Sequence, residues 1–161
     1  MTVREYNKAV EDFSSSVYRF ILKNIKDKDR ARDVVQDSFE KLWIKHESVN
    51  AEKVKSYLFS TAYHTMIDTI RKESRMTELE KVHEKDYLHE TQYSDLNEIL
   101  HHALNLLPEI QRSVILLRDY EGYSYDEIAE ITGLNESQVK VYIYRGRVFL
   151  KNYIGSPEKV I

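Results

Sequence analysis

Apolar side chains recur every three or four positions over most of the chain, which is the spacing of one face of an α-helix. This pattern predicts helices over residues 5–25, about 29–46 and about 51–73. It returns from Leu96 to Leu107, stops at Pro108 and resumes from Ile110 to Leu117. With four Gly and two Pro in 161 residues, the chain has few of the turn residues that a sheet requires. We therefore predict an all-α fold.

One break in the pattern divides the chain. Residues 76–94 mix isolated apolar side chains with charges and show no sustained stripe, so we interpret them as a flexible linker. The expected architecture is two small helical domains, an N-terminal helix bundle at residues 1–75 and a C-terminal helix-turn-helix bundle at residues 95–154. Residues 155–161 are expected to form a frayed tail.

The C-terminal domain contains the helix-turn-helix pattern. Ser124 and Glu127 form a capping box, Gly133 permits a sharp turn, and Asn135 with Gln138 caps a second helix. Residues 135–154 carry four basic side chains against one acidic one. A helix of this kind fits the major groove of DNA. Its expected DNA-binding residues are Ser137, Gln138, Lys140, Val141, Tyr144 and Arg145; the alternative is an ordinary helical hairpin with a solvated basic face.

Motifs in both halves resemble the extracytoplasmic-function (ECF) sigma factors of the sigma-70 family. Residues 107–112, 123–129, 139–140 and 145–147 are similar to region 4 of that family, and residues 33–39, 42–43 and 57–72 are similar to region 2. The two sets occur in the family's order. The resemblance implies a promoter-specificity subunit that binds core RNA polymerase, reads the minus-35 and minus-10 promoter elements and assists the initiation of transcription.

The resemblance also gives functions to two helix faces that composition alone would leave as solvated surface. On the second helix, it implies docking on the clamp helices of the polymerase β′ subunit through Asp33, Gln36, Asp37 and Glu40. The third helix and the loop at 46–50 would capture unstacked bases of the minus-10 strand through Lys53, Ser56, Ser60, His64, Arg71 and Lys72. Tyr57, Tyr63 and His64 are candidates for base stacking, with packing as the alternative.

The recognition helix departs from the family pattern. Val141 and Tyr142 stand where small polar or basic residues are common, and Tyr144 where His or another polar residue is common. The charge available for phosphate is reduced, so the promoter sequence cannot be transferred from other members. The family further implies the polymerase β flap as a contact of region 4, and an anti-sigma factor as a partner, often one anchored in the inner membrane.

Composition excludes several other functions. The chain has no Cys, and adjacent His residues on a helix point apart, so neither a metal nor another cofactor is expected at His83, His89, His101 or His102. It has no phosphate-binding loop or nucleophile motif, which argues against an enzyme. No apolar run approaches the roughly 20 residues of a membrane span, so we expect a soluble, cytoplasmic protein that is not itself a membrane protein.

Two other functions remain open from the residues. The net charge of −3 is unusual for a nucleic-acid-binding protein, although the basic stripe at 135–154 offsets it locally. One rival is a dimeric transcription factor that binds duplex DNA through its helix-turn-helix and uses the N-terminal bundle for sensing or dimerisation. Another is a helical adaptor whose partner binding does not depend on Lys140 and Arg145.

Overall fold

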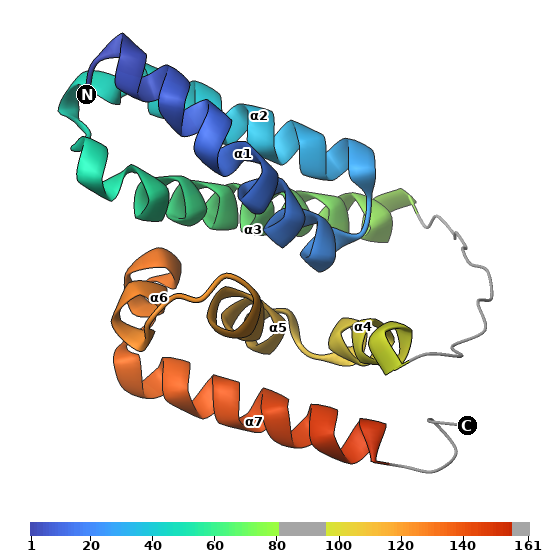
Figure 1. Ribbon diagram of the computed structural model, residues 1–161. Helices are drawn as coiled ribbons and strands as arrows, with labels where there is room; N and C mark the ends of the chain where they lie inside the picture. The colour runs from blue at the N-terminus through green and yellow to red at the C-terminus, as the bar shows by residue number, and fades with distance from the viewer. Residues whose placement is uncertain (81–95, 156–161) are drawn as a thin grey trace.

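The computed structural model describes residues 1–80 and 96–155, which form two layers of helices. Figure 1 shows α1, α2 and α3 together in one layer and α4 to α7 in the other. The described residues are helices and short connections, without strands. The all-α prediction is confirmed. Residues 81–94 of the predicted linker and 156–161 of the predicted tail lie outside the described residues.

The N-terminal layer begins with α1 (Val3–Ile25) and α2 (Lys28–Ile44). Thr2 and Glu5 form a capping box that starts α1, and Lys26 ends it in the left-handed conformation, at φ 55°. Asp27 caps α2 by accepting from the N–H of Arg30. From the sequence, Asp29 could also have capped this helix, but the capping residue is Asp27, and the helix starts at Lys28, one residue before the predicted position.

Two short 3₁₀ turns, η1 (His46–Ser48) and η2 (Ala51–Lys53), lead into α3 (Val54–Glu80). The helix continues seven residues beyond the end at residue 73 that the apolar pattern indicated. Residues 76–80, which we had interpreted as linker, are therefore helical.

The C-terminal layer contains α4 (Leu96–Leu106), α5 (Glu109–Ile115), α6 (Tyr125–Thr132) and α7 (Glu136–Ile154). Between α5 and α6 lies a π-helical turn, η3 (Leu116–Tyr120). Both predicted capping boxes, Ser124 with Glu127 and Asn135 with Gln138, are present. Gly133 ends α6 at φ 83°, where a side chain would be strained. The helix-turn-helix prediction is confirmed.

The two layers share one hydrophobic core. Phe59 of α3 packs against Phe20 of α1, with ring centroids 5.7 Å apart, and against Tyr123 before α6, at 5.2 Å. Helix α6 lies against α3, and α5 contacts α1. The sequence did not indicate that the two halves pack together. The helical pattern of α2 groups Trp43 with the inward-facing apolar residues, but Trp43 is 44% exposed while its neighbour Leu42 is fully buried. Trp43 lies at the edge of the buried stripe.

Candidate nucleic-acid and polymerase interfaces

Helix α7 is held by a stripe of buried residues that leaves its opposite side in solvent. The buried stripe consists of Val139, Ile143, Gly146 and Leu150. A Cβ atom at Gly146 would lie 2.3 Å from Cδ1 of Ile115, so α7 approaches α5 too closely for a side chain there. This close approach fixes which face of α7 points outward.

All six residues predicted for the recognition helix are exposed. The amide of Gln138 is engaged in the capping box, where its oxygen accepts from the N–H of Asn135 at 3.0 Å. Lys140 lies 3.8 Å from the carboxylate of Glu136 and 5.6 Å from the ring centroid of Tyr125. Tyr144 is the most exposed of the large apolar residues on α7, at 70%. The outward face of α7 is therefore basic at its edges and apolar in part.

A polar groove of about 340 Å³ runs between α2 and α3. Among the predicted minus-10 residues it contains Ser60 and His64, and its lining consists of Lys41, Lys45, Tyr57, Ser60, Thr61, His64, Thr65 and Asp68. The ammonium of Lys41 donates to the Thr65 hydroxyl at 2.8 Å, and Nδ1 of His64 donates to the Ser60 carbonyl at 2.8 Å. The groove thus presents hydroxyls, an imidazole and two lysines, which suit an extended strand of nucleic acid.

The three candidates for base stacking differ in how far they are exposed to this groove. Tyr57 lines it and is half-buried, and His64 is exposed beside it. Tyr63 is 6% exposed, and burial raises the pKa of its hydroxyl. Tyr63 is therefore a packing residue in this structure, as the alternative had it. Lys41 and Lys45 were missed because they lie on α2, and only the packing of α2 on α3 brings them to the groove.

The other predicted residues of α3 are divided between two surroundings. Lys53, Ser56 and Ser60 face α6 across a cavity of about 420 Å³, where Glu127 and Glu130 form the opposite wall. Arg71 and Lys72 are exposed near the far end of the helix. Part of the predicted minus-10 surface thus faces the helix-turn-helix unit, with Ser56 and Ser60 half-buried and Lys53 exposed.

The predicted polymerase surface lies along α2. Asp33, Gln36, Asp37 and Glu40 are all exposed and share one side of the helix, opposite the buried Ala31, Val34, Ser38 and Leu42. Asp33 and Asp37 also line a groove beside the ion pair of Arg30 with Glu73. The structure therefore brings these four residues together.

This acidic face ends in an apolar group that the sequence had not revealed. Ile44 is 78% exposed, and the exposed ring of Trp43 stacks on His46 at 4.3 Å and meets Tyr6 edge-on at 5.0 Å. The Tyr6 hydroxyl donates to the carbonyl of Phe39 at 3.0 Å, which holds this aromatic group on the end of α2. The sequence signal was the position of Trp43 at the edge of the apolar stripe of α2.

Polar contacts between the layers gather at the C-terminal part of α1. Arg19 donates twice to the carboxylate of Glu121, at 2.9 and 3.1 Å, and the Glu121 side chain is 5% exposed. The carbonyl oxygen of buried Asn24 accepts from Nε of Arg112 at 3.1 Å and from the Ser113 hydroxyl at 3.2 Å. Separating the layers would leave the buried Asn24 oxygen and the Arg112 guanidinium without these hydrogen bonds, which costs free energy. These contacts therefore favour one arrangement of the two layers.

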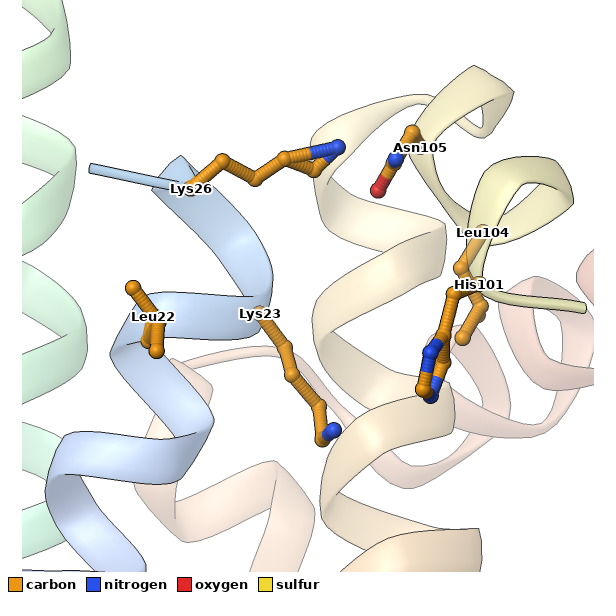
Figure 2. A pocket seen from close by; sticks show the side chains of 6 residues that line it. All are labelled: Leu22, Lys23, Lys26, His101, Leu104 and Asn105. Atoms are coloured by element: carbon orange, nitrogen blue, oxygen red, sulfur yellow. The ribbon is translucent and has the colours of Figure 1, made fainter. Parts of the chain in front are cut away.

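A cleft of about 290 Å³ opens beside these contacts, between α1 and α4. Figure 2 shows Lys23 and Lys26 on its α1 side, with Lys26 extended toward Asn105 and with His101 on the α4 side. Burial and the nearby Arg112 lower the pKa of Lys26. In residues 1–80 and 96–155, no three His, Asp or Glu side chains are grouped so that they could hold a metal ion. Within the same residues, no helix is long and apolar enough to cross a membrane.

Family models match both halves of the chain. The model for sigma-70 region 2 matches residues 9–76, and the model for sigma-70 region 4 matches residues 97–150. The chain is 35% identical over 139 residues to the RNA polymerase sigma factor SigV of Bacillus subtilis, which covers 84% of this chain and 82% of SigV. It is 27% identical over 144 residues to the ECF RNA polymerase sigma factor SigM of the same organism, covering 86% and 88%.

Solved structures have the same fold. The sigma factor RpoE of Bartonella quintana, in complex with the anti-sigma factor NepR, superposes with a TM-score of 0.82 at 26% identity, covering 96% of this chain and 99% of RpoE. CnrH, in complex with the cytosolic domain of CnrY, gives a TM-score of 0.70 at 22% identity, covering 97% and 91%. The high coverage means that both layers correspond, not one alone.

Proposed function

The chain belongs to the ECF sigma factors of the sigma-70 family and is a promoter-recognition subunit of RNA polymerase, and from this premise we propose how its helices divide that function. Residues 1–75 bind core polymerase and the minus-10 element, and residues 95–154 bind the minus-35 element. The observation that supports this most directly is that α2 and α3 carry chemically different outer surfaces next to each other, an acidic face and a lysine-bearing polar groove. No catalytic step is assigned to the chain, which acts inside the cell with polymerase.

In this proposal the groove between α2 and α3 holds the unpaired minus-10 strand. Lys41 and Lys45 supply positive charge for its phosphates, and Tyr57 and His64 supply rings beside which a base can stack. Arg71 and Lys72 continue the positive charge along α3, beyond the groove. Extruding a base from the duplex costs a few kcal/mol, which contacts of this kind offset.

The acidic face of α2 docks on the clamp helices of the polymerase β′ subunit. Its charges contribute mainly to specificity and to the rate of encounter. Trp43 and Ile44 add a desolvated contact at its end, and exposed tryptophans are frequent hot spots of protein interfaces. Region 4 makes the second polymerase contact, with the β flap, so that docking of one layer raises the local concentration of the other.

Promoter binding requires the two layers to separate. Ser56 is half-buried where it faces α6 across this cavity, so we expect a DNA strand to reach it fully only when α6 leaves α3. We expect core polymerase to favour the separated state and an anti-sigma factor to oppose binding of the polymerase. The RpoE structure, which includes an anti-sigma factor, supports the expectation of such a partner for this chain.

Reconstituted transcription tests the proposal. Core polymerase is assayed with and without the protein on promoter DNA of its host, and assembly is measured separately by size-exclusion chromatography. The Asp33→Ala/Asp37→Ala variant should lose assembly while keeping its helical circular dichroism; Glu11→Ala/Asp12→Ala on α1 is the matched control. Normal transcription with the α2 variant would refute the polymerase surface.

A second pair of variants tests the recognition helix. Lys140→Ala/Arg145→Ala should assemble normally but lose at least ten-fold in promoter binding, since a bidentate contact to guanine contributes roughly 1–3 kcal/mol. Arg4→Ala/Lys8→Ala removes the same charge from α1 and should have no such effect. Tight, specific binding to a palindromic duplex without polymerase would favour the dimeric regulator.

A further inference from the structure

The crest of α7, the line on the helix that lies farthest from its buried stripe, is mostly apolar. A helix turns by about 100° per residue, so Val141 and Val148 lie directly opposite the centre of the buried stripe, with Ser137 about 30° to one side. Tyr144 lies about 50° from this line on the same side as Ser137, and Arg145 lies about 50° from it on the other side. We call Ser137, Val141, Tyr144 and Val148 the crest residues. All four crest residues are exposed, Val141 at 43% and Tyr144 at 70%. Apolar residues that face away from the core require an explanation other than packing.

Cations flank this crest on both sides. By the same rotation, Lys140 and Lys151 lie on one flank and Arg145 on the other. Residues 137–152 contain no acidic side chain at all. When a helix lies in the major groove, its crest faces the base edges and its two flanks face the two phosphate strands. The flanks of α7 match the phosphates in charge, whereas the crest offers no charged group to the bases.

Two of the cations of α7 are already partly engaged within the protein. Lys140 lies near the carboxylate of Glu136 and over the ring of Tyr125, and Arg147 donates twice to Asp119 of η3. A bidentate contact to guanine is therefore best supplied by Arg145, on one side of the crest, and the apolar crest residues need a different group to contact. The apolar group that the major groove displays is the C5-methyl of thymine.

We propose that Val141 and Tyr144 read the minus-35 element through the C5-methyl groups of thymine. This inference rests on the proposed function, because it requires α7 to lie in the major groove of promoter DNA. Val141 is in the second turn of α7, where recognition helices meet base edges, and Tyr144 follows three residues later, about 60° around the helix on the side of Lys140. The minus-35 element of this protein is thus defined in part by methyl groups and not only by hydrogen bonds.

The test removes the methyl groups without changing the base pairs. The upstream element is first selected from a random duplex library with the full holoenzyme, formed from core polymerase and this protein. Each thymine in the selected element is then replaced by deoxyuridine, which lacks only the C5-methyl. Burial of one methyl contributes about 0.8 kcal/mol, so a contacted position should lose roughly four-fold in holoenzyme binding.

Protein variants assign the effect to the crest. In Val141→Ala or Tyr144→Ala holoenzyme, the deoxyuridine penalty should disappear at the thymine that the removed side chain contacts. Alanine favours helix, so neither variant should unfold α7. Val3→Ala, at an exposed valine of α1, is the control and should keep every penalty.

Each outcome decides a specific claim. Methyl readout is refuted if deoxyuridine has no effect at any position, or if its penalty persists in both crest variants. In that case the proposed DNA binding by α7 would depend on Lys140 and Arg145. Loss of core polymerase assembly in Val141→Ala would instead make the crest a protein contact and overturn the inference. Failure of the holoenzyme to select any upstream element would refute the proposed minus-35 function itself.

Discussion

The pair formed by Arg19 and Glu121 should control how readily the two layers separate. Glu121 is nearly buried and receives two hydrogen bonds from Arg19, whose side chain is 48% exposed. Charge-assisted hydrogen bonds contribute about 1.5–3 kcal/mol when buried, and solvent at Arg19 reduces this, so we expect about 1–2 kcal/mol. Arg19→Ala should therefore raise the ratio of open to closed molecules by roughly five- to thirty-fold.

Fluorescence transfer between two dyes measures this ratio directly. The chain has no Cys, so cysteines introduced at Glu11 of α1 and Asn152 of α7, both exposed, take the labels uniquely. Arg32→Ala is the matched control, because Arg32 pairs with Asp29 within α2 and not across the layers. Added salt should shift unsubstituted protein toward the open state and affect Arg19→Ala less.

The double variant Arg19→Glu/Glu121→Arg provides a second criterion. Reversing both charges keeps an opposite-charge pair and should restore a substantial part of the closed population that Arg19→Glu alone loses. The reasoning is wrong if Arg19→Ala behaves like Arg32→Ala, or if the reversed pair is as open as the single variant. Either result would show that the apolar contacts, and not this pair, determine separation.

Three further predictions concern the C-terminal layer. Gly146→Ala places a methyl against Ile115 and should lower stability by about 1–3 kcal/mol in urea unfolding, with Ile115→Val relieving part of the loss. Burial raises the pKa of Glu109. The favourable contribution of Glu109 to stability is therefore present below the pKa of an unfolded Glu, and it is lost as the pH rises through the pKa of Glu109 in the folded protein. Glu109→Gln should reduce this loss of stability, measured as melting temperature across that pH range. Ser124→Ala removes the cap of α6 and should cost about 1 kcal/mol, whereas Ser74→Ala, at an exposed site, should cost little.

Local signals in the sequence predicted the helices and their caps well. The two capping boxes of the helix-turn-helix depend on residues three apart, and the buried stripe of α7 depends on helical periodicity, so both can be read without tertiary structure. The same holds for the acidic face of α2, which is one side of one helix. The residue roles assigned to these faces remain proposals.

What the sequence could not supply depends on contacts between distant segments. Lys41 reaches the groove through the packing of α2 on α3, and Glu121 meets Arg19 across 102 positions of chain. Trp43 was grouped with the inward-facing residues because periodicity gives the side of a helix but not how widely the neighbouring helices cover that side. The same limit applies to Tyr63, whose burial follows from its neighbours.

The short segment that includes η3 connects the recognition helix to the other layer. Asp119 forms an ion pair with Arg147 of α7, and two residues later Glu121 forms an ion pair with Arg19 of α1. Both ion pairs therefore involve residues of the same short segment of backbone. If promoter binding to α7 alters the first pair, the second is affected through this segment. Such coupling is reciprocal. The factor by which bound DNA favours separation of α1 equals the factor by which separation of α1 raises the affinity for DNA. Polymerase and promoter would then act as mutual effectors, each preparing the protein for the other.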